Sequence, residues 1–112
     1  MTDFDLVIQH GTVVTADATS RCDVGIKDGQ VVALASNLPA GKTTLDAQGK
    51  LVLPGGIDSH CHIKQRSSNG VMTADDFYSG SVSAAFGGNT MIIPFAAQHR
   101  GQSLREVVDD YH

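Results

Sequence analysis

The feature that most constrains the fold is an alternation of strand and helix patterns in the second half of the chain. Residues 57–63 and 89–95 have strand patterns, whereas the segments at about 74–86 and from Ser103 onward have helix patterns. Strands joined through a helix become parallel neighbours in one sheet, and the nearly continuous apolar run at 89–95 predicts a strand buried on both faces. This order of elements predicts α/β architecture.

Short local signals mark where the two helices begin and end. Thr73 with Asp76, and Ser103 with Glu106, have the three-residue spacing of a capping box. The glycine pair at 87–88 is expected to end the first helix. Apolar residues recur at helical spacing on one side of this helix and predict an apolar stripe, formed by Tyr78, Val82, Ala85 and Phe86.

The first fifty residues predict a different architecture, built from short strands. Runs of β-prone residues are separated by glycines, and Asp28-Gly29 has the composition of a tight hairpin turn. The pattern changes at Pro54, which divides the chain into a β-rich part at 1–53 and a strand–helix part at 54–112. The expected strands of the first part, which suggest a sandwich or an open sheet, are 5–8, 12–15, 22–26, 31–34, 43–46 and 50–53.

The strand–helix part is too short to be a complete fold of its kind. A (β/α)8 barrel takes about 250 residues, whereas only residues 54–112 follow the change of pattern. We therefore expect the chain to be the front end of a larger protein, with a β-rich N-terminal part followed by the first βαβα segment of an α/β domain.

Composition excludes several classes of function. The 112 residues carry a net charge of −4 and show no basic stripe that could follow a nucleic-acid backbone. The longest apolar run, at 91–97, contains a proline and is too short to cross a bilayer. The acidic start lacks the regions of a secretory signal, so we expect a cytoplasmic protein with Cys22 and Cys61 as free thiols.

The residues with the clearest chemical potential lie in the first strand of the second part. In a regular strand Asp58, His60 and His62 project to one face, and Ser59 and Cys61 to the other. Two imidazoles at this spacing can reach one metal ion, and the end of a barrel strand is where barrel chemistry occurs. Packed or solvated histidines are the alternative. Cys61 is expected to act as a small apolar residue rather than a ligand.

The same residues resemble a known family. The segment Leu53–His62 is similar to the first barrel strand of the amidohydrolase superfamily. Within that superfamily the chain resembles the dihydropyrimidinase and hydantoinase branch, and the resemblance extends over nearly all of its length. The other similar segments are 11–16, 26–29, 74–77, 87–93 and 101–104.

This resemblance implies a β-sandwich followed by a metal-dependent (β/α)8 barrel in a cytoplasmic enzyme of pyrimidine degradation. It implies hydrolysis of a cyclic amide or imide by a hydroxide that bridges two zinc ions. His60 and His62 match the first two ligands of the more buried zinc, and Asp58 is expected to orient their imidazole N–H groups. By the same resemblance, the remaining ligands and the catalytic aspartate are expected on later strands, beyond His112. A homotetramer is also implied.

Two positions depart from the family pattern and bear on the substrate. Pro94 replaces an aspartate that usually follows the second strand, and Lys64 replaces the substrate-binding arginine of dihydroorotases. Lys64, Gln65 and Arg66 form a polar loop after the first strand. They are expected either to contact the substrate, which favours unsubstituted or polar rings over aromatic ones, or to be solvated.

Two other functions remain alternatives to the enzyme. One is a non-catalytic dihydropyrimidinase-related protein with a structural or interaction role, in which ligand histidines are missing. The other is a self-sufficient metal-binding β-rich module. The presence of both His60 and His62 favours the enzyme, and the unclosed barrel pattern disfavours the small module.

Overall fold

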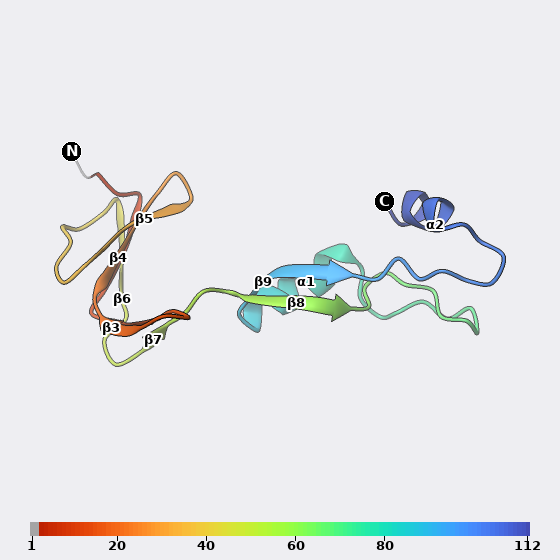
Figure 1. Ribbon diagram of the computed structural model, residues 1–112, viewed down its shortest axis with the longest axis horizontal. Coiled ribbons are helices and arrows are strands. Elements are labelled where there is room, and N and C mark those ends of the chain that lie inside the picture. The colour runs from red at the N-terminus through yellow and green to blue at the C-terminus, as the bar shows by residue number, and fades with distance from the viewer. Residues whose placement is uncertain (1–2) are drawn as a thin grey trace. The chain divides into compact units, whose positions relative to one another are not determined.

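The computed structural model describes residues 3–112 (Figure 1). Met1 and Thr2, which belong to the predicted β-rich part, lie outside the described residues. The chain divides into two compact units, one ending at Pro54 and the other running from Gly55 to His112. Neither helix of the described part has the length and apolar content needed to cross a bilayer.

The strands of the first unit are β1 (Leu6–Gln9), β2 (Thr12–Val14), β3 (Thr19–Arg21), β4 (Asp23–Lys27), β5 (Gln30–Ala35), β6 (Thr43–Asp46) and β7 (Leu51–Val52). They form two sheets, with the strand orders β5-β4-β1-β6 and β3-β2-β7. β1 is antiparallel to β4 and parallel to β6, so the larger sheet is mixed. A mixed, sheet-rich unit agrees with the predicted β-rich part of the chain.

Local sequence explains most of these strands. Asp28 and Gly29 both have positive φ, 50° and 74°, which is the geometry of the predicted turn between β4 and β5. Val7 is fully buried, and Val13 and Val24 are nearly so. Burying each such side chain contributes about 1.5–3 kcal/mol. β3 was not predicted because its residues are polar and exposed, which leaves no hydrophobic alternation to detect.

Within the first unit, one buried carboxylate holds the backbone at two other positions. Asp23 is 4% exposed, and its two oxygens accept hydrogen bonds from the backbone N–H groups of His10 and Leu38, both at 2.9 Å. The hydrogen bond from Leu38, and then that from His10, lowers the pKa of the Asp23 carboxyl against the effect of burial. A buried charge with both oxygens satisfied has a structural role.

The second unit contains β8 (Gly56–Cys61), α1 (Phe77–Phe86), β9 (Asn89–Pro94) and α2 (Leu104–Tyr111). β8 and β9 are parallel neighbours, which confirms the predicted pairing, and α1 packs against β9 (Figure 1). Gly80 brings α1 close to the segment after β8, because a Cβ there would lie 2.8 Å from Cδ1 of Ile63. The two strands are the beginning of a parallel sheet; they do not make a barrel.

The start of α1 differs from the prediction. The N-cap is Asp76, whose carboxylate accepts the Ser79 N–H at 2.8 Å while the Ser79 hydroxyl accepts the Asp76 N–H at 3.1 Å. Thr73 is not a cap, because its hydroxyl accepts the backbone N–H of Gln65 at 3.0 Å instead. The predicted helix end and second capping box are confirmed: Gly87 is the C-cap of α1, and Ser103 pairs with Glu106 at the start of α2.

The predicted burial of apolar residues in this unit is partly wrong. In the apolar stripe of α1, Tyr78 is 79% exposed and Phe86 is 92% exposed, whereas the buried residue of the helix is Gly80. On β9, Met91 and Ile93 are also exposed, so the strand is not buried on both faces within the described residues. Among the described residues, α1 is the helix that packs on this two-stranded sheet. Several apolar side chains of the unit therefore stay exposed to solvent.

Candidate metal centre

His60 and His62 come together at the carboxyl end of β8. Their ring centroids lie 5.4 Å apart with an angle of 62° between the ring planes, and both side chains are exposed. Carboxyl ends of parallel strands are the usual place for ligand sites in α/β sheets, because the loops that follow the strands gather there. The structure therefore brings the two predicted ligands to one place.

A β-bulge in β8 changes which residues share a face. Asp58 pairs with Ile92 and Cys61 pairs with Pro94. Between these two pairs β8 advances by three residues and β9 by two, which is the geometry of a β-bulge. Because Ile92 and Pro94 are two residues apart in one strand, Asp58 and Cys61 project to the same side of the sheet. The predicted placement of Asp58 and Cys61 on opposite faces is thus wrong, since the prediction assumed a strand without a bulge.

The surroundings of Asp58 agree with its position beside Cys61. Both residues line one open hollow of about 330 Å³ with the α1 residues Gly80 and Ala84, and His62 lines the same hollow. The Asp58 carboxylate accepts the backbone N–H of His60 at 3.0 Å. The contact that the structure gives Asp58 is therefore with the backbone of the bulge, not with an imidazole N–H. Burial, and then the nearby Asp58 charge, raises the pKa of the Cys61 thiol.

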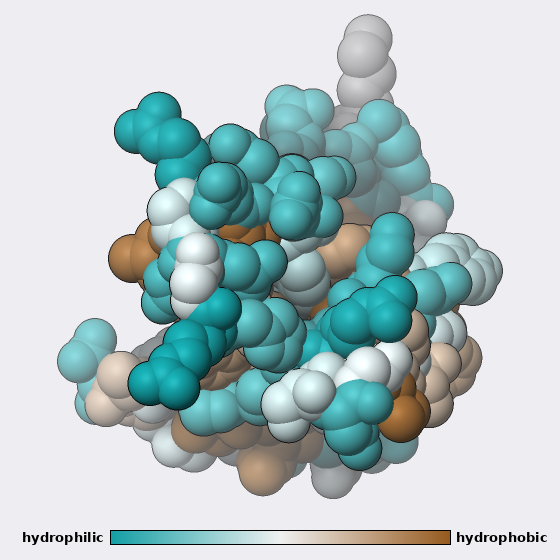
Figure 2. Space-filling model, turned by 90° about the vertical axis from the view of Figure 1, so that its right-hand side faces the viewer, coloured by the Kyte–Doolittle hydropathy of each residue, from teal (hydrophilic) through white to brown (hydrophobic). Residues whose placement is uncertain are grey.

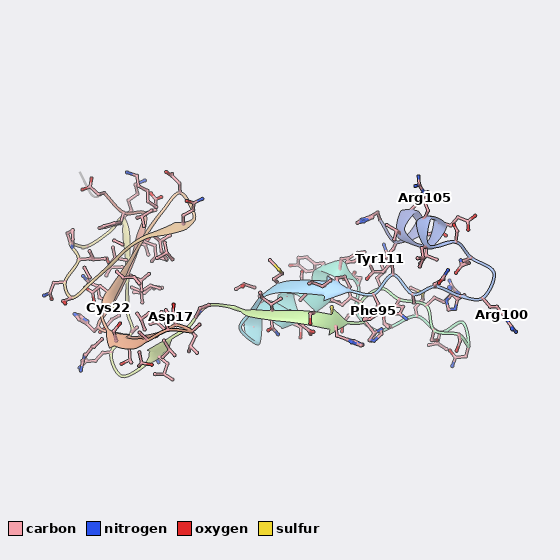
Figure 3. The ribbon with its side chains drawn as sticks, viewed as in Figure 1. Asp17, Cys22, Phe95, Arg100, Arg105 and Tyr111 are labelled. Carbon is pink, nitrogen blue, oxygen red and sulfur yellow. The ribbon has the colours of Figure 1, made fainter. Side chains whose placement is uncertain are left out.

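Phe95, which follows β9 and is labelled in Figure 3, packs against both imidazoles. Its ring is stacked on His62 with centroids 5.3 Å apart and an interplanar angle of 11°, and it lies 4.5 Å from the His60 ring at 52°. Its backbone N–H donates to the Cys61 carbonyl at 3.1 Å, which extends the parallel pairing by one step. Sequence analysis missed Phe95, although its place at the end of the neighbouring strand was a signal that it would lie near the histidines.

Gln65 contacts one of the two imidazoles. Nδ1 of His62 lies 2.6 Å from Oε1 of Gln65. A carbonyl oxygen accepts hydrogen bonds and cannot donate them, so with the Gln65 amide in this orientation the contact is a hydrogen bond in the tautomer of His62 that carries its proton on Nδ1. Nε2 of His62 then keeps its lone pair, which is what a metal ligand requires. Gln65 was predicted as a residue of the substrate loop, and its role beside His62 was not foreseen.

The other two residues of the predicted substrate loop have different side-chain contacts. Nζ of Lys64 lies 5.4 Å from the ring centroid of Phe77, and Nη1 of Arg66 donates to the Gly70 carbonyl at 3.2 Å. All three predicted loop residues nevertheless line one open hollow of about 380 Å³, together with His99 and Asp110. Figure 2 is viewed from the side on which α2 and the neighbouring loops lie in Figure 1, and the surface it shows is mainly hydrophilic with smaller hydrophobic patches.

The donors present fit part of a zinc site. Zinc sites in proteins use three or four ligands of the His, Cys, Asp and Glu types. Within residues 3–112, no group of three or more such side chains is arranged to hold a metal ion. Two imidazoles side by side, one of them with Nε2 free, supply two donors of such a set.

Comparisons with known proteins show what the chain is similar to. No family model matches it. It is 47% identical to a D-hydantoinase from Ralstonia pickettii over 93% of this chain and 22% of that protein. It is 46% identical to a dihydropyrimidinase from Rattus norvegicus over 95% of this chain and 21% of that protein. A solved D-hydantoinase structure matches it with a TM-score of 0.86 and 45% identity, over 96% of this chain and 23% of that one.

These matches fit the site and the fold described above. The chain spans about a fifth of the length of the curated relatives it matches. The names of these relatives denote hydrolases that act on cyclic amides. The high TM-score covers both units of the chain, including the strand that carries the two histidines. Along almost all of its length, the chain is therefore homologous to proteins of the D-hydantoinase and dihydropyrimidinase family.

Proposed function

We propose that the whole protein is a cyclic amidohydrolase, which opens the ring of a cyclic amide or imide by hydrolysing a C–N bond. The observation that carries the proposal is the His60–His62 pair at the carboxyl end of β8, in a chain 45–47% identical to D-hydantoinases. A non-catalytic relative would not need to keep two clustered imidazoles with a ring nitrogen free.

The domain assignment is part of the proposal. Residues 1–53 would belong to a β-sandwich, and residues 54–112 would begin a (β/α)8 barrel. The two sheets of the first unit support the first assignment. The parallel β8 and β9, with α1 as the crossover between them, support the second, because this is the repeating unit of such barrels.

The metal assignment rests on the chemistry of the donors. His60 and His62 would hold one zinc ion of a two-zinc centre, with the other ligands supplied by chain outside these residues. Zinc at such a site supplies a Lewis acid and lowers the pKa of a coordinated water to about 7. The residues of this chain orient the donors: Gln65 binds Nδ1 of His62, Phe95 packs on both rings, and Asp58 holds the backbone at His60.

The substrate preference follows from the polar loop. Lys64 and Arg66 would have to lose hydration to close over a phenyl substituent, which costs free energy that a bare or polar ring does not require. We therefore expect a preference for unsubstituted or polar-substituted rings, such as dihydrouracil or hydantoin, over phenylhydantoin. The lining of one open hollow by Lys64, Gln65 and Arg66 supports this expectation.

The cellular setting is inferred from the family resemblance alone. It comprises a cytoplasmic location, a role in pyrimidine degradation and assembly as a homotetramer. Light scattering of the purified full-length protein measures the oligomer directly, and a mass other than that of four subunits would overturn the last of these inferences.

The proposed function is tested by assaying the purified full-length protein. Ring opening of hydantoin and dihydrouracil should be lost when a chelator removes the metal and should return when zinc is added back. An inert protein that nevertheless holds its full zinc content would contradict the proposal and favour the non-catalytic relative. A clear advantage in kcat/KM for phenylhydantoin would contradict the substrate preference and leave the reaction type intact.

A further inference from the structure

We propose that Gln65 is a positioning residue that fixes His62 as the Nδ1–H tautomer, so that its Nε2 faces the metal ion. The metal part of this inference rests on the function proposed above, whereas the tautomer part does not. Gln65 lies three residues after His62 in the loop that follows β8, and its side chain is half-buried in an otherwise exposed segment.

The contact itself determines the direction of the hydrogen bond. Oε1 of Gln65 lies 2.6 Å from Nδ1 of His62. If Nε2 carried the proton, two lone pairs would face each other across this short distance. The proton therefore belongs on Nδ1, and Nε2 remains available as a donor to a metal.

The backbone of Gln65 is held so that its side chain stays in place. Its N–H donates to the Thr73 hydroxyl at 3.0 Å, and its carbonyl accepts the Thr73 N–H at 2.9 Å. The preceding residue, Lys64, has a φ of 49°, in the left-handed region that non-glycine residues rarely adopt. The Lys64 N–H donates to the Asp75 carbonyl at 2.9 Å, which holds the backbone at this position.

A second contact, with Phe95, restricts the orientation of the His62 ring. Phe95 is stacked on His62 with an interplanar angle of 11°, which fixes the plane of the imidazole. The bond to Gln65 then fixes the direction of the ring within that plane. Among the described residues, the ring nitrogens of His60 have no hydrogen-bond partner, so His62 is the histidine that the protein orients before any metal binds. Partners that fix a ligand's tautomer typically change metal affinity 10–100-fold.

The experiment compares two variants of the full-length protein. In Gln65→Leu the acceptor is lost, whereas in Gln65→Glu a carboxylate oxygen can still accept from Nδ1–H. Arg66→Gln changes the adjacent side chain and is the matched control, since Arg66 binds Gly70 and not His62. Long-range ¹H–¹⁵N correlation spectra of metal-free protein, recorded at about pH 8.5 where imidazole is neutral, report which nitrogen of His62 is protonated.

We expect the Nδ1–H form of His62 in the wild type, in Gln65→Glu and in Arg66→Gln, and a shift toward the Nε2–H form in Gln65→Leu. Zinc titration should show about 10–100-fold weaker binding for Gln65→Leu alone. An unchanged tautomer in Gln65→Leu would overturn the inference, even if zinc binding and ring opening are normal. A tautomer shift in a protein that binds no zinc would support the positioning role while contradicting the proposed function.

Discussion

Each unit of the chain holds one histidine by its Nδ1 atom, and the two cases differ in what surrounds the ring. In the first unit, Nδ1 of His10 lies 2.9 Å from a carboxylate oxygen of Asp46. Asp46 also accepts the backbone N–H of Gln48, so the pair belongs to a turn, and no second imidazole is nearby in the described part of that unit. In the second unit, His62 is held by Gln65 and stands beside His60 and Phe95.

This difference separates polar groups that hold the fold from polar groups that can bind a ligand. In the first unit, each oxygen of the buried Asp23 accepts a backbone N–H, so this carboxylate is shielded from solvent and holds the fold. In the second unit, the two imidazoles are exposed, adjacent and oriented by neighbours, and at least one nitrogen remains free. Exposure alone does not make a site; convergence of oriented donors does.

The largest expected effect distinguishes the two histidine environments. His60→Ala or His62→Ala in the full-length protein should reduce kcat/KM for hydantoin by more than about 100-fold, because each removes a proposed metal donor. His10→Ala is the matched control in the first unit and should change kcat/KM by less than about threefold. An equal loss of kcat/KM in His10→Ala and in the two second-unit variants would contradict the proposed difference between the two histidine environments.

The next effect tests the close packing of α1. Gly80→Ala places a Cβ 2.8 Å from Ile63, which should destabilise the second unit by about 1–3 kcal/mol. Hydrogen exchange of α1 amides measures this locally, and β1 amides of the first unit should be unaffected. Gly87→Ala, where the nearest atom to an added Cβ is at 3.4 Å, is the control. Unchanged exchange in Gly80→Ala would contradict the packing account.

A smaller effect tests the helix start. Asp76→Ala removes the N-cap acceptor of α1 and should cost about 1 kcal/mol, which hydrogen exchange in the first turn of the helix can detect. Thr73→Ala should leave α1 unchanged and instead loosen the Gln65 loop. If Thr73→Ala frays the helix and Asp76→Ala does not, the predicted start at Thr73 was right after all.

The sequence predicts those features that depend on residues close together in the chain, and fails where a contact joins residues far apart in it. The parallel strands, the turn at Asp28-Gly29 and the box at Ser103 depend on short spacings, and the structure confirms them. Thr73 misled because its hydroxyl binds Gln65, a contact across a loop that no local pattern reveals.

The site shows the same limit. His60 and His62 come together as their two-residue spacing predicts, although β8 ends at Cys61 and His62 lies just after it. The side on which Asp58 lies depends on a bulge, which a period-two argument cannot detect. Phe95 belongs to the neighbouring strand, so its position depends on the register between the two strands.

The smallest expected effect is a difference in pH dependence. The folded-state pKa of Asp23 is lowered from its usual 3.8 by its backbone hydrogen bonds, so this carboxylate stabilises the fold above about pH 4. That contribution is lost as the pH falls through the lowered pKa. The free energy of unfolding should therefore fall less steeply below pH 4 in Asp23→Asn than in the wild type. Asp17→Asn, at an exposed position, should match the wild-type slope.

The most direct test of the central claim is a crystal structure of the full-length protein with anomalous data collected at the zinc absorption edge. We expect an anomalous peak about 2.0–2.1 Å from Nε2 of both His60 and His62, with Nδ1 of His62 still bound to Gln65. Zinc bound through Nδ1 of His62, or a zinc peak at other residues with these two imidazoles free, would contradict it.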